Sequence, residues 1–144
     1  MKTLAIASAL SACLITAALA QDEPLPAPVS DQKIAFAKIE ERKDSLKEKI
    51  VLIEIDKLLG EGTDWGKLVR FIAKDTSGSK TPYGQIAFPK EGLVRIAPLL
   101  KVSDHPFTIY AKIHVFGGEA AALSEVVGTK FTPNADKTGG TYSW

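Results

Sequence analysis

Apolar and polar residues alternate along two neighbouring stretches of the chain, residues 50–56 and 67–75. A period of two places every second side chain on one face of a β-strand, and β-branched and aromatic residues favour that conformation. The side chains that we expect to face inward are Val51, Ile53, Ile55, Val69, Phe71 and Ala73. Residues 60–66 contain several glycines and predict the turn of a long hairpin.

Three more strands are predicted downstream. Residues 85–88 form a short third strand that stops at Pro89, and residues 107–116 show the most regular alternation in the chain. A fifth strand is expected from Ala121 to Phe131. The side chains expected to be almost fully buried, each on the apolar side of its strand, are Ile53, Phe71, Ile109 and Ile113.

Two helices are predicted from apolar residues spaced three and four positions apart. Residues 31–42 form an N-terminal amphipathic helix with Ser30 as its cap and charged residues on the remaining faces. Residues 91–100 form a short helix between the third and fourth strands, where Gly92 and Pro98 favour a kink.

Three strands, a helix and two further strands is the element order of the OB-fold, a five-stranded Greek-key barrel. The segment DSLKEKIVLIEID and, downstream, PFTIYAKIHVFG resemble that pattern over roughly residues 45–131. The chain therefore resembles small exported OB-like proteins of bacteria, which have no established activity. The resemblance implies a mainly β fold, with a five-stranded OB-like barrel and a short helix between strands three and four. It also implies a binding or structural module without catalytic residues.

The first 20 residues predict a signal peptide. A single Lys2 precedes an apolar run, and Ala18-Leu19-Ala20 supplies the small residues that a signal peptidase accepts. We favour cleavage after Ala20 and export to the periplasm or the medium. The alternative is a lipobox at Leu10-Ser11-Ala12-Cys13, which would leave a lipid on Cys13 and make the protein an anchored structural component of the cell envelope. The apolar run continues beyond Cys13, which argues against this alternative.

The remaining chain divides into a proline-rich leader, residues 21–29, and one domain, residues 30–144. We expect no transmembrane segment after signal cleavage. The chain has 18 basic and 17 acidic residues, and cleavage removes Lys2 but no acid. Balanced charge does not favour nucleic acid, whose phosphates bind an excess of Lys and Arg. Because cleavage also removes the single cysteine, we expect no disulfide, no cysteine metal site and no cofactor.

OB-type barrels bind ligands on the outer face of strands two and three and in adjacent loops. We therefore predict a ligand-binding face that includes Arg70, Lys74 and Tyr83. A second outward group is expected on the fourth strand, formed by Tyr110, Lys112 and His114. Aromatic rings beside cations can hold single-stranded nucleic acid, but such residues are more often the solvated side of half-buried strands.

Other candidate chemistry is sparse. Glu54 and Asp56 share one strand face and suggest a hydrolase as a third hypothesis. His105 and His114 are not expected to meet at a metal. No nucleophile-elbow, zinc-protease or phosphate-loop motif occurs in the sequence. We thus expect a non-catalytic binding module whose partner is a protein or a saccharide.

The first prediction concerns the N-terminus of the exported protein. Intact-mass measurement should find a chain that begins at Gln21, because Ala20 ends the acceptable cleavage motif. A diacylated chain that begins at Cys13 would contradict this result and favour the anchored alternative.

Overall fold

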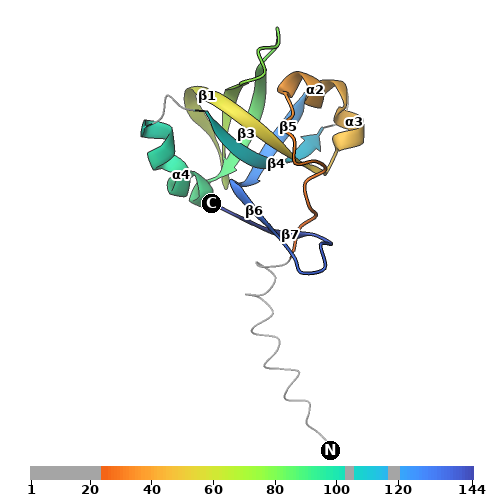
Figure 1. Cartoon of the computed structure of the whole chain (residues 1–144). Coiled ribbons are helices and arrows are strands. Elements are labelled where there is room, and N and C mark those ends of the chain that lie inside the picture. The colour runs from red at the N-terminus through yellow and green to blue at the C-terminus, as the bar shows by residue number, and fades with distance from the viewer. Residues whose placement is uncertain (1–23, 103–105, 117–120) are drawn as a thin grey trace, which may run out of the picture.

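The computed structural model describes residues 24–102, 106–116 and 121–144. Five strands form a closed barrel in the order β1-β2-β3-β5-β4 (Figure 1). They are β1 (Ile50–Trp65), β2 (Leu68–Asp75), β3 (Tyr83–Pro89), β4 (Phe107–Val115) and β5 (Ala122–Gly128). All neighbours pair antiparallel except β3 and β5, which are parallel. This order and the mainly β content confirm the predicted OB-like architecture.

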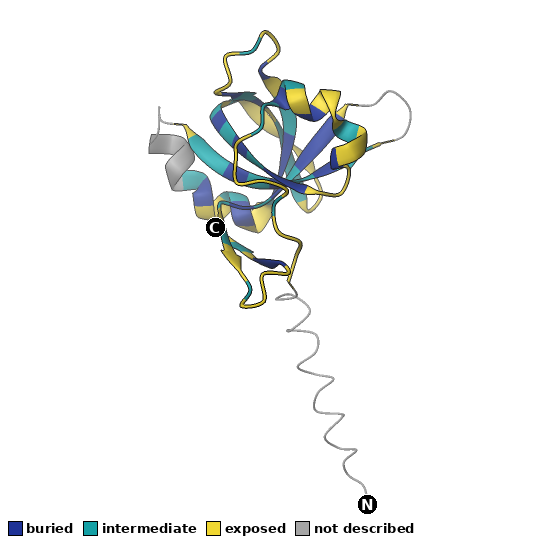
Figure 2. Ribbon diagram, turned by 45° about the vertical axis from the view of Figure 1, so that its right-hand side comes forward, coloured by how far each residue is buried: buried dark blue, intermediate teal, exposed yellow. Residues whose placement is uncertain are grey.

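Two helical regions lie on opposite sides of the barrel (Figure 1). Helix α4 (Lys90–Val102) connects β3 to β4 and continues through Gly92 and Pro98, so the predicted helix is confirmed in its place. On the other side, α2 (Phe36–Glu41) is followed at once by the short α3 (Lys43–Leu46). Both contribute buried apolar residues to the core, which Figure 2 shows in dark blue along the barrel strands.

The N-terminal helix begins later than its predicted start at residue 31. Residues 31–35 instead run beside β1, where Lys33 bridges Leu52 and the Ile34 amide donates to the Leu52 carbonyl at 2.9 Å. The helix is capped from a distant strand: the buried Asp75 carboxylate accepts the Phe36 amide at 2.8 Å. Tertiary hydrogen bonds therefore set where α2 begins.

The first hairpin is longer than predicted. β1 continues through the expected turn to Trp65, and the reversal occurs at Gly66, whose φ is +77°. The alternation is broken here because β1 and β2 pair with a register shift between Leu59 and Thr63, and Gly60 adopts a positive φ within it. Gly66 therefore marks the turn, whereas Gly60 marks a bulge in a continuous strand.

The predicted fifth strand is divided in two. β5 ends at Gly128, and β6 (Lys130–Pro133) leaves the barrel to pair with β7 (Gly140–Ser143). A Cβ at Gly128 would lie 2.8 Å from the Ser143 carbonyl oxygen, so only glycine lets β7 approach this closely. Trp144 then packs against Gly92 of α4. Figure 1 shows the C-terminus next to α4.

The described part of the predicted leader, from Pro24 onward, lies against the domain. Leu25 exchanges backbone hydrogen bonds with Gly140, and the Val29 amide donates to the Ile50 carbonyl at 2.9 Å. The Tyr142 hydroxyl also donates to the Pro26 carbonyl at 2.8 Å. Its prolines keep the segment extended, and these contacts hold it on the barrel surface.

The inward faces of the strands were predicted correctly, with one exception in the degree of burial. Ile53, Ile109 and Ile113 are each 0% exposed. Phe71 points to the core and meets the Phe88 ring edge-on at 5.9 Å, but it is only partly buried, so full burial was wrong. Gly62 of β1 lies directly against this ring, because a Cβ added at Gly62 would come within 2.7 Å of Phe71 Cζ, so the position has no room for a side chain.

The second prediction compares two core truncations. Ile109→Ala should lower the free energy of unfolding by about 2–5 kcal/mol, because its side chain is fully enclosed. Phe71→Ala should fall below the roughly 3–5 kcal/mol of a fully buried phenylalanine, because part of the ring is already in solvent. Urea denaturation measures both, with the exposed Val94→Ala as control. A Phe71→Ala protein as stable as the parent would contradict the strand register.

Candidate functional site

The outer face of the β1-β2-β3 sheet exposes three large apolar side chains. Trp65, Ile72 and Tyr83 are 45%, 37% and 53% exposed. Trp65 pairs with Leu68 at one end of β2, and Tyr83 pairs with Lys74 near the other. At about 3.3 Å per residue, the two aromatic residues are separated by about 20 Å along the strand. We call this surface, defined by Trp65, Arg70, Ile72, Tyr83 and Gln85, the β2-β3 face.

Arg70 and Gln85 form a polar pair between the two aromatic residues. The Arg70 Nη1 donates to Gln85 Oε1 at 3.0 Å, and the guanidinium carbon lies 5.3 Å from the centre of the Trp65 ring. These two contacts fix the guanidinium in place. Its Nε is buried and has no hydrogen-bond partner among the described residues.

Two hollows lie on this surface, one on each side of the paired Arg70 and Ala87. The first measures about 300 Å³ and is bordered by Ile72, Tyr83 and Gln85. The second measures about 540 Å³ and is bordered by Leu68 and Pro89, with Lys90 and Glu125 beside them. A ligand that lies along β2 would meet both hollows.

The structure places Arg70 and Lys74 on one face of β2, as the alternation predicted, and Tyr83, which was expected in the following loop, lies on β3 opposite Lys74. Lys74 lies 3.8 Å from the Asp56 carboxylate, so its charge is partly compensated. Sequence analysis missed Trp65 and Gln85, because residue 65 was assigned to a turn and residue 85 to the start of a short strand. It also passed over Ile72, whose signal was visible: it is an apolar residue on the polar side of the alternation.

The predicted trio on β4 does not form one surface. Tyr110 turns to the β6-β7 hairpin, where its ring lies 6.1 Å from Phe131 and 5.4 Å from Tyr142. Burial, together with the neighbouring Tyr110, raises the pKa of Tyr142 to about 12. This aromatic cluster attaches the hairpin to the barrel.

Lys112 and His114 belong to a separate ionic cluster. His114 Nε2 lies 2.6 Å from Glu125 Oε1, and its Nδ1 lies 3.3 Å from Glu48 Oε2, while Lys112 lies 4.0 Å from the same Glu48 oxygen. The two carboxylates are on opposite edges of the imidazole ring and do not converge on one point. Residues 24–102, 106–116 and 121–144 contain no grouping of His, Cys, Asp and Glu that could hold a metal ion. His105 lies outside the described residues.

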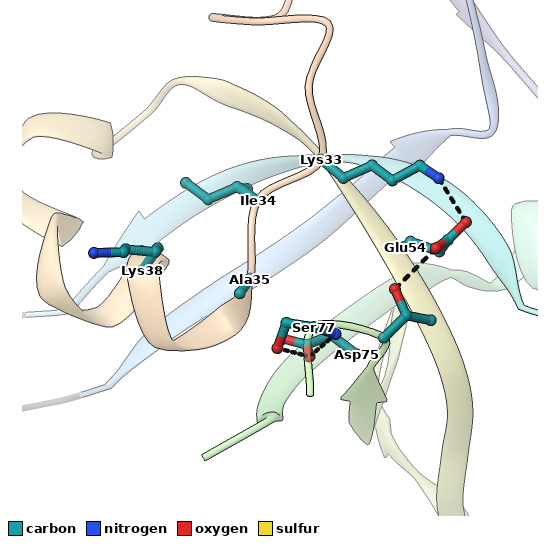
Figure 3. Close-up of a pocket in the computed structure, with 8 residues that line it drawn as sticks. Lys33, Ile34, Ala35, Lys38, Glu54, Asp75 and Ser77 are labelled. Atoms are coloured by element: carbon teal, nitrogen blue, oxygen red, sulfur yellow. Dashed lines mark hydrogen bonds and ion pairs between the residues drawn. The ribbon is translucent and has the colours of Figure 1, made fainter. Parts of the chain in front are cut away.

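A third cavity, of about 320 Å³, lies where residues 33–38 cross the end of β2 (Figure 3). Glu54 Oε2 accepts Lys33 Nζ at 2.8 Å and Glu54 Oε1 accepts the Thr76 hydroxyl at 2.8 Å. These two hydrogen bonds lower the pKa of Glu54 below 4.5. A general acid needs a raised pKa, so this arrangement gives the hydrolase hypothesis no support.

Asp75 borders the same cavity and is already engaged (Figure 3). Besides the Phe36 amide, its carboxylate accepts the Ser77 amide at 2.9 Å and the Ser77 hydroxyl at 2.6 Å. The carboxylates of this cavity therefore hold the N-terminal segment and the end of β2 together.

Comparison with known proteins finds no matching family model, no matching curated protein and no matching solved structure. In the part of the chain that the structure describes, no helix is long and apolar enough to cross a membrane.

The third prediction follows from the lowered pKa of Glu54. A carboxylate with a depressed folded-state pKa stabilises the fold above its unfolded pKa and loses that contribution as pH falls through the folded value. Glu54→Gln should therefore lower the free energy of unfolding by up to about 1 kcal/mol at neutral pH, and the difference should vanish well below pH 4.5.

Denaturation at neutral pH and at a pH well below 4.5 tests this expectation. The matched control is Glu61→Gln, a change on the same strand at an exposed position, and it should leave stability unchanged. An equal loss in Glu54→Gln at both pH values would show that the ion pair with Lys33 is not the cause.

Proposed function

We propose that this chain is an exported, non-catalytic binding domain that holds a protein or a saccharide on its β2-β3 face. The observation that carries the proposal is the joint exposure of Trp65, Ile72 and Tyr83 on one sheet face. Ile72 and Tyr83 are diagonal neighbours across β2 and β3, and adjoining exposed apolar side chains on a small domain are typical of interaction sites. Export is proposed from the signal-peptide pattern of residues 1–20.

The compensation of charge supports this proposal over a nucleic-acid function. Lys74 lies 3.8 Å from Asp56, and Lys90, beside the second hollow, lies 3.0 Å from Asp64. Arg70 is shared between Gln85 and the Trp65 ring. A phosphate backbone would have to compete with each of these contacts, and the balanced chain offers no long-range attraction to help it.

The fourth prediction tests the face with one charge-introducing variant. Immobilised protein should capture a component from an envelope extract of the source cell, and Ile72→Glu should abolish capture, because it replaces an apolar contact in the middle of the face by a charged group that binding would have to desolvate. The matched control is Val29→Glu, at an exposed apolar position on the N-terminal segment, and it should capture normally.

Circular dichroism should confirm that both variants fold. Capture that survives Ile72→Glu but fails in Val29→Glu would move the binding surface away from β2-β3 and contradict the proposal.

A further inference from the structure

The geometry points to a neutral oligosaccharide with equatorial hydroxyl groups as the ligand of the β2-β3 face. This inference rests on the proposed function, because it names the class of ligand for the same surface. It depends on three features of the face: two separated aromatic rings, a fixed polar pair between them and the compensation of nearby charge.

The aromatic rings supply flat apolar surface at the two ends of the face. Trp65 and Tyr83 keep about half of their surface in solvent, and each combines an apolar ring with a polar group. A pyranose with equatorial hydroxyls presents C–H groups above and below its ring, and such a C–H face packs against an aromatic side chain. The spacing of about 20 Å along β2 gives room for several sugar rings in a row.

The polar pair supplies hydrogen bonds to hydroxyl groups between those rings. A guanidinium carries five N–H donors and a glutamine amide carries two. One bond joins the pair, from Arg70 Nη1 to Gln85 Oε1. The Arg70 Nε is buried, but the remaining guanidinium donors and the Gln85 amide group have no other partner among the described residues and can address adjacent hydroxyls. Because Trp65 and Gln85 already hold the guanidinium, little side-chain freedom is lost on binding.

The distribution of polar and apolar groups favours a saccharide over a protein. Protein interfaces concentrate their apolar anchors at the centre and surround them with a polar rim. On the β2-β3 face the aromatic rings lie at the ends, and the Arg70–Gln85 pair lies between them beside the single aliphatic side chain of Ile72, so the centre carries no aromatic anchor. Because Asp56 partly compensates the charge of Lys74, the face favours a neutral saccharide over an acidic one.

The test uses the two tryptophans of the chain as separate reporters. Nitrogen-15 NMR of the purified protein should show the Trp65 indole N–H signal shifting on titration with millimolar cellotetraose or chitotetraose. The Trp144 signal should stay unchanged, because that ring packs against Gly92 of α4. Absence of a Trp65 shift with both sugars overturns the inference, as does an equal shift of both indoles.

Two variants connect the shift to the face. Tyr83→Ala should weaken the affinity for the sugar that binds by about tenfold, or about 1.4 kcal/mol, and Gln85→Ala should weaken it similarly. Val29→Ala is the matched control and should bind as the parent does. Unchanged affinity in both Tyr83→Ala and Gln85→Ala overturns the inference.

The outcome also separates this inference from the function on which it rests. If no sugar shifts Trp65 while a protein is captured and lost in Ile72→Glu, the binding face stands and its ligand is a protein, which overturns the saccharide. If neither a sugar nor a protein binds, both proposals fail.

Discussion

The barrel is closed by three residue pairs between the parallel strands β3 and β5, in which Gln85, Ile86 and Ala87 pair with Leu123, Ser124 and Glu125. Every other neighbouring pair in the barrel is antiparallel, and β1 and β2 share a long hairpin. This short contact removes the open edges that a five-stranded sheet would otherwise expose. It also fixes which residues of β3 face outward, because a strand held on both sides cannot slip by one residue without turning its apolar side chains to water.

Segments outside the barrel then cover some of its outer surface. Residues 29–35 lie along β1, held by backbone bonds to Ile50 and Leu52, and Lys33 pairs there with Glu54. The β6-β7 hairpin covers Tyr110 on β4 through the aromatic cluster with Phe131 and Tyr142. The β2-β3 face has neither cover and keeps Ile72 and Tyr83 exposed. The β2-β3 face is therefore a part of the outer surface that neither the N-terminal segment nor the β6-β7 hairpin covers.

The buried Asp75 connects the N-terminal segment to the barrel. It lies at the end of β2, caps α2 through the Phe36 amide and orders the following turn through Ser77. A buried carboxylate is tolerated only when its oxygens are satisfied, so the helix start and the turn are both held to the end of this strand. The N-terminal segment, the end of β2 and the start of the β2-β3 loop form one unit for this reason.

The amino-acid sequence by itself determined the barrel strands, their inward faces and the helix between the third and fourth. A period of two and helical spacing are local properties that survive in any tertiary context, so Ile53, Ile109 and Ile113 were placed correctly. The same alternation put Arg70 and Lys74 on one face, whereas the place of Tyr83 on β3 came from the tertiary structure. Only the tertiary structure decided where elements end and which outward residues stay free. Phe71 is only partly buried, Gly128 admitted β7, and distant carboxylates engaged Lys112 and His114. Each of these outcomes depends on contacts between segments far apart in the chain, which local periodicity does not encode.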